Sequence, residues 1–394
     1  MCGMSRRLIA ILAVAAGIAV ANLYYAQPLL PMIAATWGLS ARAVASMVTF
    51  AQMGYAVGLL LVVPLGDKLE RRRLILTMLG LVTFALLAIA AARNPVWLMI
   101  ASFAMGVTTI TPQLVVPFAA HLAGARQRGR VVGSVMSGLL VGILVARTVS
   151  GALGAWLGWR AVYVVAAGLM LVLAALLARE LPRSEPESTG LSYYALLLSL
   201  AQLLRDEPIL RASSFYGGMS FAAFSAFWNV LPFLLTGKPY LYGTAVIGLF
   251  GLIGATGITV APLAGRMADR GHAVAVIGAG LAISLAGYTL LWALPMHLPA
   301  LIAGIVIIDF GITSNQISNQ WRIYSIRPEA RNRINTVYMV SYFVAGSLGS
   351  YLGAWGWTAG GWSGYCYVAA AFITVALVVF AIASQSRYRK HQRS

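Results

Sequence analysis

Long apolar runs recur along the whole sequence, and they limit the chain to one class of fold. Twelve of them are long enough to cross a hydrocarbon core of about 30 Å as helices. They cover residues 8–34, 43–65, 74–92, 96–121, 131–156, 160–179, 209–235, 243–264, 273–293, 298–323, 334–355 and 363–384. The alternating polarity of membrane β-barrel strands is absent from these runs. We therefore predict an all-α polytopic membrane protein with twelve transmembrane helices in two six-helix halves.

Composition and the first run agree with this prediction. Only 10% of the residues are charged and 60% are hydrophobic, whereas a soluble domain carries about 25% charged residues. Arg6 and Arg7 precede the first apolar run, as they would in a signal peptide. Because the run continues well beyond the apolar core of a signal peptide, we expect an uncleaved helix.

The net charge of +18 first suggests a nucleic-acid partner, but the positions of the charges exclude that interpretation. Twenty-two basic residues lie at the termini and in alternate connections, and four lie in the remaining connections. The positive-inside rule then places both termini in the cytoplasm. The basic residues are a topology signal with some affinity for anionic lipid.

Two features divide the chain into halves. The longest polar connection, residues 178–194, separates six spans from six. The segment RVVGSVMSG at 130–138 also aligns with RINTVYMVS at 333–341. We predict an N-terminal half over 1–180, a cytoplasmic linker over 181–207 and a C-terminal half over 208–394. Two parallel six-helix halves are typical of transporters that rock about a site at the membrane midplane.

Three motifs carry a resemblance to a known family. The loop GRMADRG at 265–271 is similar to the loop motif of the major facilitator superfamily. The segments NLYYAQPLLP at 22–31 and GILVARTVSG at 142–151 resemble drug/proton antiporter-type bacterial exporters. That group includes purine nucleoside and arabinose-type sugar efflux proteins. The resemblance implies the major facilitator fold, a bacterial inner-membrane location and proton-driven export.

The loop motif predicts a conformational latch at the cytoplasmic ends of the helices. A carboxylate beside a helix N-terminus is favoured by the helix dipole, and neighbouring arginines add charge contacts that sliding helices would break. The alternative is that these charges only set topology and solubility. The predicted latch residues are Asp67, Arg71, Arg72, Gly265, Asp269 and Arg270.

A carboxylate lies in the middle of the apolar run IVIIDFGITSN, at Asp309. Insertion of such a group costs about 2.5–3.5 kcal/mol, so it is expected to have a partner or to line a polar path. Thr313, Gln316 and Gln320 follow it on the same helix face. Arg147 lies at similar depth in the fifth span. We hypothesise that Arg147 and Asp309 interact and couple protons to conformational change. The alternative is a permanent structural role for both residues.

Polar and aromatic side chains at helical spacing in other spans are candidates for a substrate cavity, because pockets combine aromatic walls with a few polar groups. Aromatic residues close to helix ends, such as Tyr25, are also typical of membrane-interface anchors. The candidates are Asn22, Tyr25, Gln27, Gln52, Tyr55, Gln113, Phe224, Trp228, Thr313, Gln316, Asn319, Tyr338 and Tyr342.

The sequence thus predicts a secondary active transporter that exports a small organic solute by proton antiport with alternating access. A proton-coupled uptake symporter of the same fold is the first alternative, and a membrane enzyme or sensor is a remote one. No ATP-binding phosphate loop is present in the sequence. We expect a monomer that interacts with a small-molecule substrate, protons and membrane lipid, without a metal, a cofactor or nucleic acid.

Overall fold

The computed structural model describes residues 5–123, 127–183, 192–327 and 330–391, and every element in these ranges is helical. The chain forms two compact units. Unit 1 comprises residues 1–202 and 235–252, and unit 2 comprises residues 203–234 and 253–394.

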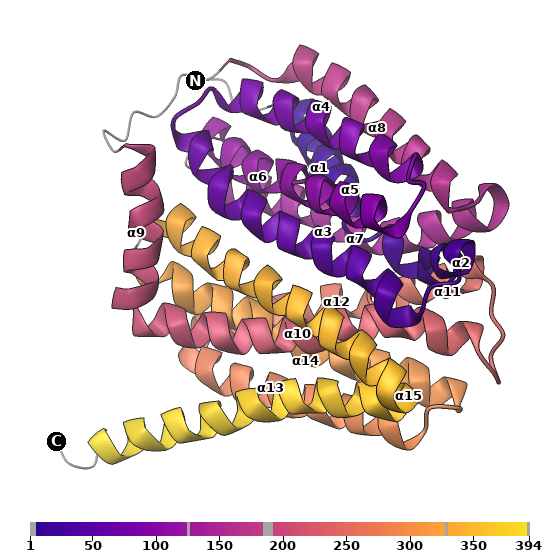
Figure 1. Cartoon of the computed structure of the whole chain (residues 1–394). Helices are drawn as coiled ribbons and strands as arrows, with labels where there is room; N and C mark the ends of the chain where they lie inside the picture. Colours follow the sequence, from indigo (N-terminus) through magenta and orange to yellow (C-terminus); the bar gives the residue numbers. More distant parts are fainter. Residues whose placement is uncertain (1–4, 124–126, 184–191, 328–329, 392–394) are drawn as a thin grey trace. The chain divides into compact units, whose positions relative to one another are not determined.

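Unit 1 contains most of the first half of the chain (Figure 1). Its helices are α1 (Arg6–Ala21), α2 (Ala26–Trp37), α3 (Ala41–Leu61), η1 (Val63–Asp67), α4 (Arg71–Ala90), α5 (Pro95–Thr108), α6 (Thr111–Leu122), α7 (Arg128–Leu157) and α8 (Trp159–Glu180). Most of α9 (Tyr193–Asp206) and of α11 (Thr244–Ile253) also belongs to it.

Unit 2 contains most of the second half. Its helices are α10 (Pro208–Thr236), which ends in unit 1, α12 (Thr256–Met267), η2 (Ala268–His272), α13 (Ala273–Ala293), α14 (Leu298–Tyr324) and α15 (Arg331–His391).

Two glycines explain how these helices give twelve crossings. Ten helical stretches of the described chain are long and apolar enough to span a membrane. One of them, within α15, has 55 residues, although a single crossing needs only about 20. Gly361, with a φ of 58°, breaks α15 into two crossings. Gly271, with a φ of 86°, separates α13 from α12, which follows the short apolar helix α11 in the chain.

Small residues let helices approach closely in each unit, as is usual between transmembrane helices. In unit 1, a Cβ atom added to Gly17 of α1 would lie only 2.5 Å from the carbonyl oxygen of Gly138 of α7 and would collide with it. In unit 2, a Cβ atom on Gly349 of α15 would collide with the carbonyl oxygen of Ala222 of α10. The two units therefore use the same kind of backbone contact between an early and a late helix.

The range predicted as a linker contains a helix that the sequence analysis did not identify. Helix α9 begins after Ser192, whose hydroxyl accepts a hydrogen bond from the Ala195 amide at 3.1 Å. Leu196 and Leu200 are buried on one face of α9. The Tyr193 hydroxyl donates to the Leu61 carbonyl at the end of α3, at 2.6 Å. Residues 184–191 of the predicted linker lie outside the described residues.

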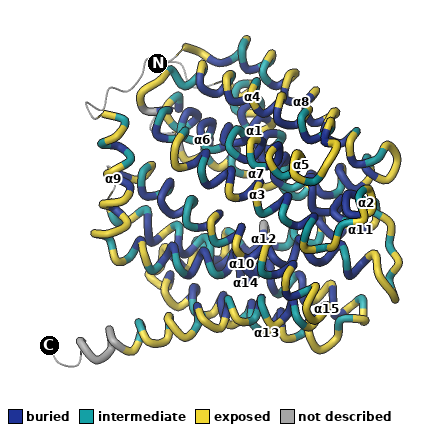
Figure 2. The backbone as a smooth tube through the Cα atoms, viewed as in Figure 1, coloured by how far each residue is buried: buried dark blue, intermediate teal, exposed yellow. Residues whose placement is uncertain are grey.

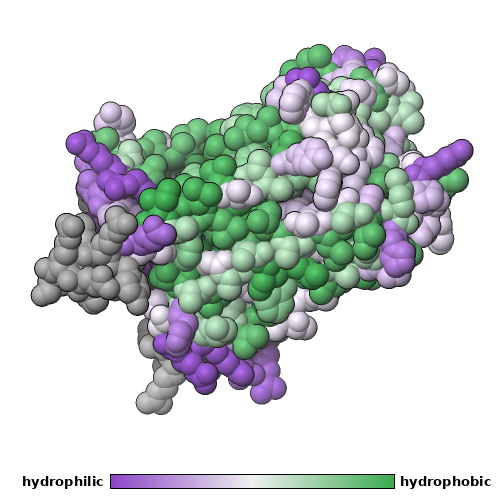
Figure 3. All heavy atoms as spheres, turned by 90° about the horizontal axis from the view of Figure 1, so that it is seen from below, coloured by the Kyte–Doolittle hydropathy of each residue, from purple (hydrophilic) through white to green (hydrophobic). Residues whose placement is uncertain are grey.

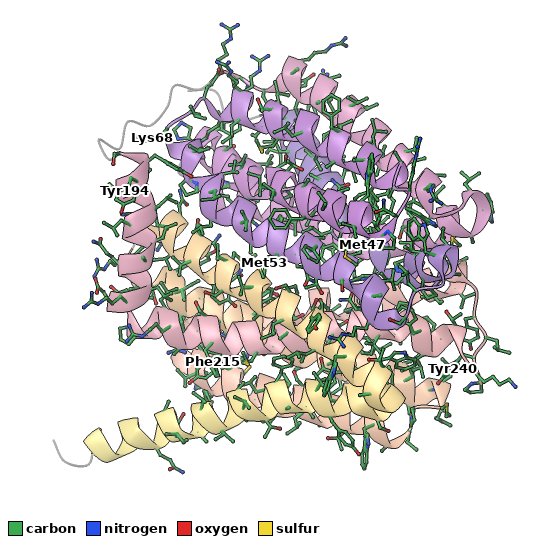
Figure 4. The ribbon with its side chains drawn as sticks, viewed as in Figure 1. Met47, Met53, Lys68, Tyr194, Phe215 and Tyr240 are labelled. Carbon is green, nitrogen blue, oxygen red and sulfur yellow. The ribbon has the colours of Figure 1, made fainter. Side chains whose placement is uncertain are left out.

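The surface is apolar over long stretches of helix, as lipid contact requires. Buried and exposed residues alternate along helices such as α4 and α13, whereas α10 is buried over most of its length (Figure 2). Hydrophobic side chains cover most of the surface seen in Figure 3, and hydrophilic ones gather toward its ends. Phe84, Ile100 and Val172 are among the exposed apolar residues. Tyr240, labelled in Figure 4, lies in the connection after α10, with its ring 5.5 Å from that of Tyr242.

Candidate functional site

Arg147 of α7 is held inside unit 1 by a neutral amide and an aromatic ring. Its side chain is 3% exposed. The guanidinium Nε donates a hydrogen bond of 2.6 Å to Oε1 of Gln27, and Cζ lies 5.0 Å from the centroid of the Tyr24 ring. A charge-assisted hydrogen bond and a cation–π contact both stabilise a buried cation. Two side chains of one chain segment therefore fix the orientation of Arg147.

Local sequence explains why that segment and α11 reach Arg147. Tyr24 lies in the turn that precedes α2, and Gln27 lies three residues later in the first turn of α2. On α11, a Cβ atom added to Gly251 would lie 2.7 Å from Cβ of Arg147. The Thr148 hydroxyl donates to the Gly248 carbonyl at 3.1 Å. Glycines on α11 thus leave the space that the Arg147 side chain occupies.

The other cavity candidates in unit 1 do not form one group. The Tyr55 and Gln113 side chains are hydrogen-bonded to each other. The Asn22 amide instead donates to Sδ of Met170 on α8, at 3.4 Å. Gln52 and Tyr25 are buried. Tyr24 was not among the residues predicted for the site, although it lies only three residues before the predicted residue Gln27.

Asp309 of α14 is also buried, with 4% of its surface exposed. It is the only buried carboxylate among the described side chains. The hydroxyl of Tyr288 on α13 lies within the range of the electrostatic interaction with Asp309. One turn further along α14, the Thr313 side chain packs against Gly257 of α12. Helices α12 and α13 of unit 2 therefore pack beside this part of α14.

The polar face of α14 is partly satisfied by the helix itself. Asn319 donates from Nδ2 to Oδ1 of Asn315 at 2.8 Å, and both residues are fully buried. Gln316 and Thr313 are half-buried. Asn319 therefore has a structural hydrogen bond in addition to its predicted place in the cavity.

An aromatic cluster joins α10 and α15 within unit 2. The rings of Phe221 and Tyr342 are stacked, with centroids 4.0 Å apart and an interplanar angle of 17°. Tyr338 extends the cluster on one side, 5.9 Å from Tyr342. Phe224 and Trp228 extend it on the other, with centroids 6.1 Å apart. Four predicted cavity residues are thus brought together through Phe221. Phe221 was not predicted for the site, although it has helical spacing with Phe224 and Trp228.

The predicted latch residues contact backbone and one tryptophan. In unit 1, Arg71 donates to the Gly66 carbonyl at 3.2 Å, and Arg72 donates to the Ala178 carbonyl at the end of α8. In unit 2, Trp321 Nε1 donates to Oδ1 of Asp269 at 3.0 Å.

The three remaining predicted latch residues are Gly265, Arg270 and Asp67. Gly265 has open space around it, and Arg270 is exposed. The side chain of Asp67 lies outside the described part of the chain. The latch stays a prediction. So does the interaction of Arg147 with Asp309, since these residues belong to different units.

Comparison with known proteins assigns the chain to a family. The sequence profile of the Major Facilitator Superfamily matches residues 12–320. The chain is 43% identical over 377 residues to the "Uncharacterized transporter YgaY" of Escherichia coli O157:H7, covering 96% of this chain and 95% of the relative. It is 36% identical to the "Probable transporter SCO4007" of Streptomyces coelicolor, with coverages of 96% and 88%. It is 23% identical to the "Probable sugar efflux transporter" of Helicobacter acinonychis, with coverages of 83% and 82%.

Solved structures share the fold. A bacterial homologue of the human lysosomal transporter Spinster, in an inward-facing conformation, superposes with a TM-score of 0.76 at 15% identity, over 96% of each chain. The predicted all-α polytopic membrane fold is confirmed. The family model and the relatives together show that the chain belongs to the Major Facilitator Superfamily, as a multi-pass membrane transporter rather than an enzyme.

Proposed function

We propose that the chain exports a small organic solute across the bacterial inner membrane by proton antiport with alternating access. The single observation that carries the coupling mechanism is the buried carboxylate of Asp309. An ionised carboxylate inside a membrane protein is costly and is usually found on a proton or ion path. A group that takes up and releases a proton in each cycle accounts for that cost.

The aromatic cluster and the buried amides support a substrate with a flat ring and hydrogen-bonding groups. Aromatic rings such as those of Phe224 and Trp228 stack on planar or apolar faces. Amide and hydroxyl groups such as Gln113 and Tyr55 can both donate and accept hydrogen bonds. Nucleosides, sugars and amphipathic drugs fit this description, and the relative named as a sugar efflux transporter supports sugars.

Alternating access would move the two predicted halves, residues 1–180 and 208–394, against each other. The latch residues would then stabilise one state through contacts such as that between Trp321 and Asp269. Arg147 would respond to the protonation of Asp309, which links the proton to the movement.

Transport into proteoliposomes tests this function. A panel of nucleosides, arabinose and other sugars, and cationic dyes is offered to vesicles under pH gradients of either direction. Antiport predicts that an acidic lumen drives uptake of at least one compound, because protons leave as the solute enters. Uptake driven by an acidic exterior would instead indicate the symporter.

Two variants complete the test. Asp309→Asn is expected to lower gradient-driven uptake by more than about tenfold, whereas Asp206→Asn, on the exposed side of α9, should transport like the wild type. Gradient-driven uptake that survives Asp309→Asn would remove Asp309 from the coupling mechanism.

A further inference from the structure

Two buried tyrosines form a series with Asp309 inside unit 2. Tyr288 of α13 and Tyr365 of the second part of α15 are 1% and 0% exposed. Neither hydroxyl has a hydrogen-bond partner among the described residues. A buried hydroxyl left in this way costs about 1–3 kcal/mol. Phenylalanine would fill the same space without that cost, so packing alone does not explain either hydroxyl.

Helix register places Tyr288 next to Asp309. Helices α13 and α14 pack against each other, and the short connection 294–297 between them makes them run in opposite directions. A Cβ atom added to Gly287 would lie 2.7 Å from Cγ1 of Ile308 and 3.2 Å from its backbone nitrogen. Tyr288 follows Gly287, and Asp309 follows Ile308. In two helices that run in opposite directions, these next residues lie on the same side of the helix pair. Their side chains are near enough for the charge of Asp309 to act on the Tyr288 hydroxyl.

Register also places Tyr365 next to Tyr288. Trp362 Nε1 donates to the Leu291 carbonyl at 2.8 Å. Helix α13 and the second part of α15 also run in opposite directions. Tyr288 precedes Leu291 by three residues on α13, and Tyr365 follows Trp362 by three residues on α15. Both steps lead away from this bond in the same direction.

Each tyrosine lies nearer to the end of its own helical segment than Asp309 lies to the start of α14. At 1.5 Å per residue, Tyr365 is about 6 Å beyond the break at Gly361, and Tyr288 is about 7.5 Å from the end of α13. Asp309 is about 16.5 Å from the start of α14. The charge distribution in the sequence predicts that this end of the helices faces the outside.

We propose that Tyr365 and Tyr288 form a hydroxyl relay that carries protons between the outside and Asp309 through the interior of unit 2. The relay rests on the proton-coupling role proposed for Asp309. It gives protons a route lined by α13 and α15, whereas the substrate candidates of unit 2 lie on α10, α14 and the first part of α15.

Each transfer conserves protons and charge. A proton from outside binds the Tyr365 oxygen while the proton already on that hydroxyl passes to Tyr288. Tyr288 in turn gives its own proton to the carboxylate of Asp309, and a bridging water carries each of the two transfers, because neither hydroxyl is hydrogen-bonded within the described structure. Each phenol is neutral before and after, as expected near pH 7. Only Asp309 changes charge, from −1 to 0.

Protonation kinetics test the relay without a known substrate. Proteoliposomes are acidified on the outside, and the carbonyl stretch of protonated carboxyl groups is followed by time-resolved infrared spectroscopy. The band that Asp309→Asn abolishes is assigned to Asp309. Tyr288→Phe and Tyr365→Phe are compared with Tyr163→Phe of α8, whose buried hydroxyl likewise has no hydrogen-bond partner in the described structure.

The relay predicts slower protonation in the two relay variants alone. The Asp309 band should rise at least about 10²-fold more slowly in Tyr288→Phe and Tyr365→Phe, the low end of the effect of a positioned proton-transfer group. Its final amplitude at low pH should be unchanged, which also verifies folding. A merely structural role would shift the midpoint of the band's titration and leave its rate unchanged.

Two results would overturn the relay, and they differ. Wild-type rates in both phenylalanine variants, with a normal Asp309 band, would exclude the relay and leave antiport at Asp309 intact. Absence of any Asp309 band in the wild type at low pH would exclude the proton role of Asp309 itself, on which the relay depends.

Discussion

Nε of Arg147 donates a 2.6 Å hydrogen bond to Oε1 of Gln27, across 120 residues of sequence. Both residues are buried. The bond connects α7 to the start of α2 and points the planar guanidinium in one direction. A lysine would lack that planar donor pattern and the same contact with the Tyr24 ring.

Loss of the Gln27 acceptor should loosen Arg147. Gln27→Met keeps the size of the side chain and removes the carbonyl oxygen. We expect a loss of about 1.5–3 kcal/mol in stability, the usual contribution of a hydrogen bond to a charged group, together with slower transport. Thermal unfolding in detergent and proteoliposome uptake measure the two effects. Thr83→Val, which removes only a local hydrogen bond to the Leu79 carbonyl within α4, is the control, and equal losses in both variants would contradict the prediction.

Gly251 should not tolerate a side chain. A Cβ atom there would lie 2.7 Å and 3.1 Å from Cβ and Cδ of Arg147. Gly251→Ala is therefore expected to destabilise the packing of α11 on α7 by about 1–3 kcal/mol, as overpacking usually does. Gly243→Ala, at a position with nothing within 4 Å, is the matched control. The unfolding temperature of the purified protein compares them, and indistinguishable values would show that Arg147 moves aside.

The stack of Phe221 on Tyr342 should matter for substrate binding. Phe221→Leu keeps an apolar side chain and removes an aromatic contact worth about 0.5–1.5 kcal/mol. We expect KM for the transported compound to rise several-fold while kcat changes little, because Tyr342 loses its support. Phe233→Leu, which alters the more distant ring contact with Trp357 on the same two helices, should leave KM unchanged. A KM shift of the same size in both variants would refute a specific role for the stack.

The bond from Trp321 to Asp269 should influence conformation more than stability. Trp321 and Asp269 are exposed, so Trp321→Phe is expected to change the free energy of unfolding by less than about 0.5 kcal/mol. If the latch acts as proposed, the variant should alter the transport rate and the labelling rate of a cysteine introduced at Ser325. Trp292→Phe, an exposed tryptophan of α13, serves as the comparison. Identical labelling in all three proteins would mean that this bond takes no part in a latch.

The membrane crossings and the unusual carboxylate could be predicted from the sequence because both depend on local composition. A stretch such as residues 298–323 must be helical in lipid, since every backbone group needs an internal hydrogen-bond partner. The free-energy cost of inserting Asp309 into the membrane follows from the apolar residues next to it in the sequence. The α9 helix escaped prediction because the polar residues before it dominated that part of the chain, although Leu196 and Leu200 have helical spacing.

The partners of the buried polar groups were decided only by tertiary structure. Hydropathy adds up residue by residue along the chain, whereas a hydrogen bond depends on which helices adjoin and on their register. The sequence placed Arg147 in a span and could not show that Gln27 and Tyr24 face it. It likewise contained Tyr288 and Tyr365 as two ordinary aromatic residues of apolar spans. The close approach of α13 to α14, through Gly287 and Ile308, brings Tyr288 beside Asp309, and the bond from Trp362 to Leu291 brings Tyr365 beside Tyr288.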